Sequence, residues 1–401
     1  MKNKFSFLFF IPILFSSCAL LTASKFDKIQ KNSKVTPSVF KEIIPIEAVG
    51  NVVVKVKIQD KFYNFLVCSD CYGCVLSSEL SKTLKLEVIG KETVKDDNNK
   101  DTEYSWVKVD HIGIGNLDFS DIICVTDDLK RYNDERCIAI QGIIGTNLLA
   151  KAIWQFDFQN QKITITNDKK SLDFAPDKKI IPFNLDSANG LGVPIIKLRN
   201  KGNYICDAYL AIGWESTISL PKGIHKMLSD TLPKLVELSL DSIITKKEAN
   251  VTKTPNLAID NIVSLAPYWV WDSSTKDYGY IGNGVFSDFV ITLDWMAREA
   301  TFSNQRKVET ACPTVGYHTN SKLIVNTLFK NSPADKAGLM LGDKILDYDG
   351  KDVSNLTEEQ FCEWSYALEQ KDKIKLKVQR NDKIFEITLE SVYFDSFFSK
   401  N

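Results

Sequence analysis

Alternating apolar and polar residues predict β-hairpins in two separate parts of the chain. Residues 51–68, NVVVKVKIQDKFYNFLVC, form two apolar-rich runs around a polar turn, which is the pattern of a hairpin. Residues 193–213, VPIIKLRNKGNYICDAYLAIG, repeat it. Residues 105–125, SWVKVDHIGIGNLDFSDIICV, add further short strands. We therefore expect a mainly β protein.

The same stretch of chain contains an internal repeat. IIPI at 43–46 recurs as IIPF at 180–183, and GIIGTNLLAKAIWQFDF at 142–158 recurs as GYIGNGVFSDFVITLDW at 279–295, both 137 residues later. Such a long period does not indicate a solenoid. It indicates one lobe made twice, and we place the two β-rich lobes at residues 40–168 and 169–306.

Each lobe resembles the aspartic proteases of the retropepsin and pepsin type. In that family an apolar strand leads into an Asp-Thr-Gly turn, and a later segment of two apolar residues and a glycine packs beneath the turn. GIIGTNLL is very close to the retropepsin form of the later segment, and YIGNGVF is its counterpart in the second lobe. The resemblance implies a two-lobed pepsin/retropepsin-like β-barrel pair.

The chain departs from this family at both turns. Cys68-Ser69-Asp70 stands in place of the first Asp-Thr-Gly, and Ala211-Ile212-Gly213 in place of the second. The family reaction requires two neighbouring carboxylates that share one proton. A thiol with an ordinary pKa of about 8.5 is a poor base for activating water, and alanine has no titratable group. The sequence thus predicts that no catalytic residue is intact.

Two arrangements would rescue catalysis, and both stay open as alternatives. Asp70 and Glu215 would have to meet as a rebuilt pair of acids, although they are not equivalent by the repeat. Cys68 would need a base to act as a nucleophile, and no histidine is placed by a motif to serve as one. Otherwise Cys68 is expected to be a half-buried thiol or a disulfide partner.

The remaining cysteines suggest disulfides more than a metal site. Cys68, Cys71 and Cys74 form C-x-x-C-x-x-C, a spacing that also suits a metal, but no fourth ligand is apparent. Cys124 and Cys137 flank a polar loop, whose ends a disulfide between them would join. We predict no metal and no cofactor.

The N-terminus has the pattern of an export signal. Two lysines precede an apolar stretch of about eleven residues, which is too short to span a membrane. FSSC follows and ends at Cys18, and it resembles the lipobox of bacterial lipoproteins. We predict a signal peptide at 1–17, lipidation of Cys18, a tether at 18–39 and a place in the cell envelope, in the periplasm or at the cell surface. The alternative is an ordinary secretory signal cleaved near Ala23.

The C-terminal part, residues 307–395, strongly resembles a PDZ domain. KLIVNTLF, SPADKAGL and GDKILDYDGKDV follow one another in the family's order, and TVGY at 314–317 stands where its peptide-binding loop belongs. The resemblance implies that backbone N–H groups at Val315, Gly316 and Tyr317 hold the C-terminal carboxylate of a peptide, which adds to the sheet as a strand.

Composition narrows the choice of function. The chain has 401 residues, with 44% hydrophobic and 25% charged residues and a formal net charge of −1. A nucleic-acid partner therefore has no electrostatic support. The leading hypothesis is a peptide- or protein-binding protein of the cell envelope, an inactive aspartic-protease homologue whose inter-lobe cleft holds an extended peptide. The alternatives are a divergent active aspartic endopeptidase and a structural envelope lipoprotein.

Overall fold

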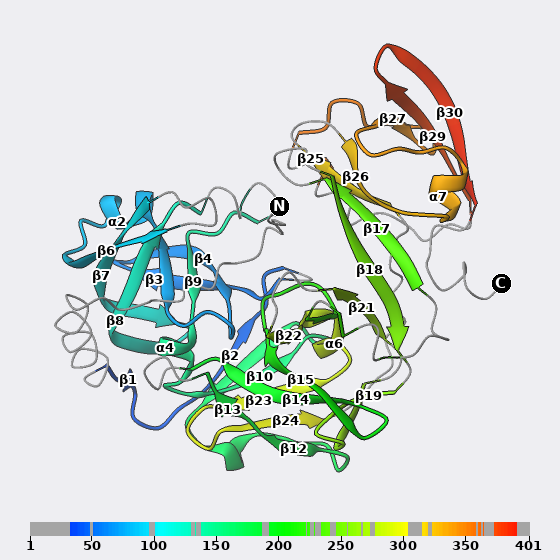
Figure 1. The fold of residues 1–401 in the computed structure, drawn as a ribbon. Helices are drawn as coiled ribbons and strands as arrows, with labels where there is room; N and C mark the ends of the chain where they lie inside the picture. Colours follow the sequence, from blue (N-terminus) through cyan, green and yellow to red (C-terminus); the bar gives the residue numbers. More distant parts are fainter. Residues whose placement is uncertain are drawn as a thin grey trace.

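The computed structural model is mainly β, with a few short helices (Figure 1), which confirms the expected fold class at that level. It describes residues 33–48, 51–95, 101–129, 133, 138–186, 192–221, 223–224, 228, 234–240, 246–254, 256–265, 268–272, 277–303, 315–319, 323–357, 360–361, 364 and 373–390. The predicted signal peptide and Cys18 lie outside these residues. Within them, none of the helices combines the length and the apolar character that crossing a membrane requires.

The first sheet is built from the first half of the body, up to residue 168. Its strands lie in the order β1-β8-β5-β9-β4-β3-β7-β6. The two residues between β3 and β4, Gln59 and Asp60, both have positive φ, which is the geometry of a tight two-residue hairpin turn. The hairpin expected at 51–68 is thus confirmed. The strands are β1 (Val35–Thr36), β3 (Val53–Ile58), β4 (Lys61–Val67), β5 (Cys74–Ser77), β6 (Val88–Lys95), β7 (Asp101–Ile114), β8 (Leu117–Asp127) and β9 (Gly142–Ile144).

The second sheet joins the two halves of the body. Its order is β12-β24-β23-β10-β11-β2. At its centre, β10 and β23 run antiparallel with Gln155 opposite Thr292. The amide of Gln155 donates to Oγ1 of Thr292 at 3.1 Å, and the two residues are 137 positions apart. The strands are β2 (Lys41–Pro45), β10 (Ile153–Asp157), β11 (Lys162–Thr166), β12 (Lys179–Pro182), β23 (Val290–Asp294) and β24 (Glu299–Ser303).

The third sheet combines the second half of the body with the C-terminal unit. Its main path is β20-β19-β14-β15-β22-β16-β21-β18-β17-β26-β27-β29-β30, and β13, β25 and β28 pair with β14, β26 and β27. The strands of the body are β13 (Asn184–Leu185), β14 (Pro194–Asn200), β15 (Asn203–Leu210), β16 (Ile218–Leu220), β17 (Lys234–Leu240), β18 (Lys246–Thr254), β19 (Leu257–Ile259), β20 (Val263–Leu265), β21 (Tyr268–Asp272) and β22 (Tyr278–Ile281).

The pairings of the first sheet recur in the third. β4 runs parallel to β9, and β15 runs parallel to β22. β5 lies between β8, which is parallel to it, and β9, which is antiparallel; β16 lies in the same way between β21 and β22. In the first half, β6 and β7 form an antiparallel hairpin whose second strand also pairs with β8. In the second half, β17 and β18 form a hairpin whose second strand pairs with β21 in the same way. The two halves therefore follow one path.

The helices are short. Two of them, α4 (Thr146–Leu149) and α6 (Asn283–Phe286), follow β9 and β22, and each begins after a glycine with extended backbone, Gly145 and Gly282. These two helices occupy equivalent places in the two halves. The other helices within the described residues are α2 (Ser78–Thr83), η1 (Lys169–Ser171) and α7 (Pro333–Lys336).

The C-terminal unit has a core of its own. Its strands are β25 (Val315–Thr319), β26 (Leu323–Phe329), β27 (Lys344–Tyr348), β28 (Lys351–Asp352), β29 (Lys373–Arg380) and β30 (Lys383–Glu390). Trp364, Val325 and Ile345 are buried in a cluster separate from that of the body, with Phe361 packed against it. The body and this unit are joined through the sheet, because β17 pairs with β26 (Figure 1).

Candidate functional site

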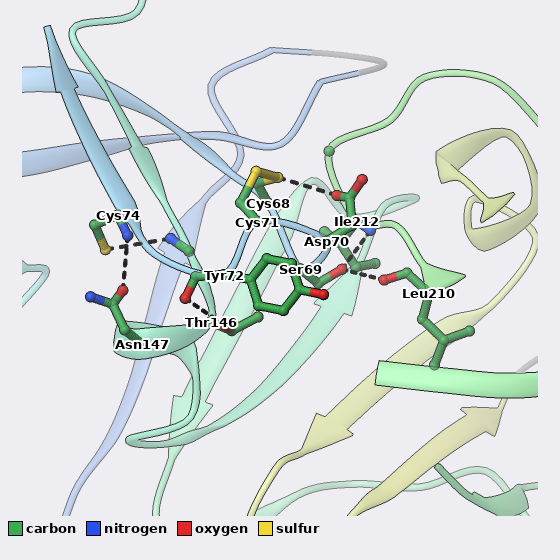
Figure 2. The surroundings of a disulfide bond; sticks show 12 residues. Cys68, Ser69, Asp70, Cys71, Tyr72, Cys74, Thr146, Asn147, Leu210 and Ile212 are labelled. Atoms are coloured by element: carbon green, nitrogen blue, oxygen red, sulfur yellow. Dashed lines mark hydrogen bonds between the residues drawn. A yellow bond between two sulfur atoms is a disulfide. The ribbon is translucent and has the colours of Figure 1, made fainter. Parts of the chain in front are cut away.

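The turns at residues 68–70 and 211–213, which the sequence analysis compared with Asp-Thr-Gly, meet between the halves of the body (Figure 2). The backbone N–H of Ile212 donates to Oγ of Ser69 at 2.7 Å, and the Ser69 hydroxyl donates to the carbonyl of Leu210. The N–H of Ser69 donates to the carbonyl of Ile212 at 3.2 Å. Ser69 is fully buried. One serine thus supplies both side-chain bonds that tie the turns together.

Gly213 allows the second turn to approach the first. Its φ is +98°, and a Cβ at this position would overlap the carbonyl oxygen of Val67. Any other L-residue would be strained by the φ and would also collide with the opposite backbone. Glycine is therefore required here.

A glycine and a short helix lie beneath each turn. A Cβ on Gly145 would overlap the carbonyl of Gly73, and the N–H of Thr146 donates to the carbonyl of Cys71 at 2.8 Å. In the second half, the N–H of Asn283 donates to the carbonyl of Trp214 at 2.7 Å. These contacts hold the backbone of each turn against the start of the short helix that packs on it.

Cys68 is joined to Cys71 in a disulfide, with the two Cα atoms 5.4 Å apart. The disulfide alternative considered from the sequence thus holds for Cys68, which carries no free thiol in this state. Ala211, at the matching position of the second turn, is fully buried. Neither position offers a base or a nucleophile.

Asp70 is the acid closest to the turn tips in sequence. Its Oδ1 lies 3.2 Å from Sγ of Cys68, and burial raises the pKa of its carboxyl to about 7. Glu215, the acid that a rebuilt pair would require, accepts a hydrogen bond from the Asn51 amide.

A cluster of aromatic residues surrounds Asp186 beside the turns. The sequence patterns did not predict this cluster. The hydroxyl of Tyr209 donates to Oδ2 of Asp186 at 2.8 Å, and that of Tyr72 donates to the same oxygen. The Tyr209 ring lies 5.3 Å from that of Tyr280. Burial, and then Asp186, raises the pKa of both Tyr72 and Tyr209. Tyr209 lies on β15, two residues before Ala211. Because side chains two positions apart in a strand point to the same side, the sequence could have predicted that Tyr209 lies on the same face of the sheet as Ala211.

The disulfide considered between Cys124 and Cys137 is wrong for Cys124. Its thiol is free and buried, and it stands opposite Cys74 across the parallel strands β5 and β8. Cys137 lies outside the described residues. The sequence pointed to the ends of a loop, whereas the strand register directs the Cys124 side chain into the core.

The sulfur and carboxylate groups at the first turn come close enough to share an ion. One ligand atom each from Cys68, Asp70 and Cys71 lies within 4.8 Å of the others. The disulfide removes both thiolates, which are the metal-binding form of cysteine. In this oxidised state the cluster provides only a carboxylate.

The predicted peptide-binding residues lie at the start of β25, not in a loop. β25 pairs antiparallel with β26, and the register shifts between Gly316 and Tyr317. The side chains of 315–319 are outside the described residues, so their role stays a prediction. Elsewhere in the unit, half-buried Arg380 donates to both carboxylate oxygens of the buried Asp343 at 2.7 Å.

Comparisons with known proteins bear on the C-terminal unit. A family model for the PDZ domain matches residues 300–390. Tight junction protein ZO-3 of Canis lupus familiaris is 34% identical over 76 residues, which is 19% of this chain and 8% of that protein. Regulator of sigma E protease of Haemophilus influenzae is 35% identical over 71 residues, 18% of this chain and 15% of that protein. The chain thus spans only a small part of each relative, and its residues 300–390 are a PDZ domain.

Proposed function

We propose that the chain is a peptide-binding protein of the cell envelope, with an aspartic-protease-like body that has lost catalysis and a PDZ domain that captures peptide C-termini. One observation carries the loss of catalysis: the two turns keep their mutual hydrogen bonds while a disulfide and an alanine occupy the acid positions, Cys68 and Ala211.

The protease-like origin of the body is supported by its symmetry. Gln155 and Thr292 face each other and are separated by the same 137 positions as the sequence repeats. A twofold relation between two copies would make equivalent residues meet at its axis. The matched pairings of β4–β9 and β15–β22 agree with that relation. The likeness concerns architecture, and architecture alone does not assign an activity.

The absence of peptidase activity follows from the groups at the turn tips. The reaction needs one carboxylate to take a proton from water while a second polarises the scissile carbonyl. Asp70 brings one carboxyl near the first turn, and its contact is with the Cys68 sulfur. Ala211 brings none. The same turns join the two halves through hydrogen bonds, and we propose that an extended peptide binds between these halves.

Peptide binding by the C-terminal unit rests on its being a PDZ domain. Such domains bind peptide C-termini by adding the ligand as a strand to a sheet edge. We assign the carboxylate contact to the backbone at Val315, Gly316 and Tyr317. A short extended peptide loses entropy on ordering and makes few contacts, so its affinity is modest.

The experiment is a binding titration of the mature chain with fluorescent peptides made as free acids and as C-terminal amides. We expect amides to bind about tenfold more weakly, since hydrogen bonds to a charged acceptor are worth roughly 1.5–3 kcal/mol. Gly316→Val should weaken binding of the acids. Lys383→Ala, at an exposed strand end, is the matched control and should bind as the wild type does. Equal binding of acids and amides would refute the carboxylate contact.

We also propose export and lipid anchoring through Cys18, based on the N-terminal signal pattern. Lipidation would hold the chain at a membrane surface through its tether. Cys18→Ala should then release the protein from the membrane fraction, and unchanged retention with an unmodified Cys18 would count against it.

A further inference from the structure

The Cys68–Cys71 disulfide is expected to contribute little to the stability of the fold. It closes a loop between residues only three positions apart, and the stabilisation gained from closing a loop falls as the loop becomes shorter. The turn it spans is also held by other bonds, since Ser69 is tied to Leu210 and Ile212 of the second turn. Stability alone therefore gives little reason for this bond.

The contact between the disulfide and Asp70 depends on protonation. Oδ1 of Asp70 lies at hydrogen-bond distance from Sγ of Cys68, 3.2 Å (Figure 2). A disulfide sulfur carries no hydrogen, so the donor has to be the protonated carboxyl of Asp70. After reduction the Cys68 thiol would be the donor, and the ionised carboxylate would accept. The same pair of atoms thus suits both redox states, with the proton on opposite sides.

The two sulfurs differ in their access to solvent. Cys68 is only 1% exposed, whereas Cys71 is half-buried. Attack on a disulfide requires a thiolate to reach one sulfur, and the other sulfur leaves. Cys71 is the reachable sulfur, and Cys68, beside Asp70, is the leaving one.

We propose that Cys68–Cys71 is a redox-active disulfide that exchanges with dithiols, with Asp70 as the proton donor and acceptor for Cys68. This activity is separate from the peptide binding proposed above and does not depend on it.

The exchange balances in two steps. A thiolate of an external dithiol bonds to Sγ of Cys71, and the Cys68–Cys71 bond breaks. Its electron pair goes to Sγ of Cys68, which takes the proton of Asp70 and becomes a thiol. The second thiolate of the reagent then displaces Cys71, which takes a proton from water. The reagent leaves as a disulfide, oxidised by two electrons, and the protein is reduced by two.

The surroundings allow Asp70 to work near neutral pH. Burial brings the pKa of its carboxyl to about 7, so both of its forms are populated there. Among the described residues, the sulfurs of Cys68 and Cys71 lie close to its carboxyl, and Tyr280 of β22 is near enough that burial, and then Asp70, raises the pKa of its hydroxyl. Tyr280 stays protonated in this range and donates no charge to the site.

The first experiment uses the intact mature chain under native conditions. The protein is incubated with dithiothreitol, quenched with acid, then unfolded in guanidinium, alkylated, and mapped by mass spectrometry of its peptides. We expect Cys68 and Cys71 to be labelled together only after the dithiothreitol treatment, while the free thiols of Cys74, Cys124 and Cys206 are labelled with or without it. A disulfide that resists reduction until the chain unfolds would overturn the proposal.

A pair of matched variants tests which sulfur is attacked. Cys68→Ser leaves the half-buried Cys71 as a free thiol, and Cys71→Ser leaves the buried Cys68. With a chromogenic aromatic disulfide, Cys71 in the first variant should react on the order of tenfold faster than Cys68 in the second, because access limits thiol reactivity. The opposite order would overturn the assignment of Cys71.

Asp70→Asn tests the proton transfer. The rate of reduction at pH 7 should fall on the order of a hundredfold, the lower end of the usual contribution of a general acid, and the inflection of the rate near pH 7 should disappear. Asp60→Asn, in an exposed hairpin turn, should keep the wild-type rate and profile. If Asp70→Asn keeps the inflection, Asp70 has no part in the exchange. Should this variant fail to fold, the pH profile of the wild type decides, since a profile without an inflection near 7 overturns the same role.

Discussion

In the first turn, the side chain of Ser69 makes two hydrogen bonds to the opposite turn, whereas in the second turn Ile212 offers only its backbone. The first turn also carries a disulfide and a titratable acid, Cys68–Cys71 and Asp70. The second carries the buried Ala211 and a glycine with positive φ. The first turn carries polar and titratable groups, whereas the second contributes the backbone shape that lets the turns touch.

This difference separates two requirements that a catalytic turn normally combines. Close approach of the halves depends on backbone geometry and on one hydroxyl, and both persist without any acid at the first turn position. Catalysis of the aspartic-protease type would depend on paired carboxylates, which Cys68 and Ala211 do not supply. On the proposed function, assembly of the halves and catalysis are separate requirements, and each can be tested by a separate substitution.

The largest effect is expected from filling the space at Gly213. Gly213→Ala would place a Cβ against the carbonyl of Val67 on a backbone with φ of +98°. We expect a loss on the order of 4 kcal/mol in the free energy of unfolding, from backbone strain and overpacking together. Denaturant unfolding of the protein measures this.

Gly73→Ala is the matched control in the first turn region. A Cβ there would meet nothing within 4 Å, so its unfolding free energy should change by less than about 0.5 kcal/mol. Equal effects of the two substitutions would contradict the close approach at Gly213.

A smaller loss is expected from removing the hydroxyl that joins the turns. Ser69→Ala leaves the N–H of Ile212 and the carbonyl of Leu210 without their bonds to Ser69. An unsatisfied buried group costs roughly 1–3 kcal/mol, and thermal unfolding should show this loss. Ser69→Thr keeps a hydroxyl and should recover most of it. If alanine and threonine behave alike, the hydroxyl does not join the halves.

The sequence predicted the architecture of these turns better than their chemistry. Alternating patterns gave the hairpin β3–β4, and the repeated glycine segments marked the elements beneath both turns. The cluster around Asp186 stayed hidden, because Tyr72 and Asp186 are 114 positions apart and only the packed fold brings them together. Cys124 was misassigned for a related reason. Its partner across the strands is set by register, which spacing along the chain does not reveal.

Asp70 in the first turn should make the free energy of unfolding depend on pH. The residues of the second turn, 211–213, have no titratable side chain and should make no such contribution. Burial raises the pKa of the Asp70 carboxyl to about 7 in the folded protein, against about 4 for an unfolded aspartate. Between these values the unfolded chain releases its proton and the folded chain keeps it. The stabilisation is complete below pH 4 and is lost as the pH rises to about 7, by at most about 1.4 kcal/mol per pH unit.

Asp70→Asn should therefore flatten the stability of the protein between pH 4 and 7, as measured by denaturant unfolding at a series of pH values. Asp60→Asn serves as the control, because Asp60 is exposed and its pKa is lowered through Lys57. A pH dependence that survives in Asp70→Asn would have to come from another group.

The smallest effect is expected from placing acids at the two turn positions. The wild type should not cleave an unfolded protein mixture between pH 3 and 8, and neither Cys68→Asp nor Ala211→Asp should create activity, because each provides one acid where the reaction needs two. The double variant should also stay inactive. Asp70 would crowd the new pair with a third carboxyl, and Ile212 has no hydroxyl to match that of Ser69. Cleavage by the double variant that a transition-state mimic of aspartic proteases blocks would show that acids at these two positions are sufficient for the reaction. Cleavage by the wild type with the same inhibition would instead favour an active endopeptidase.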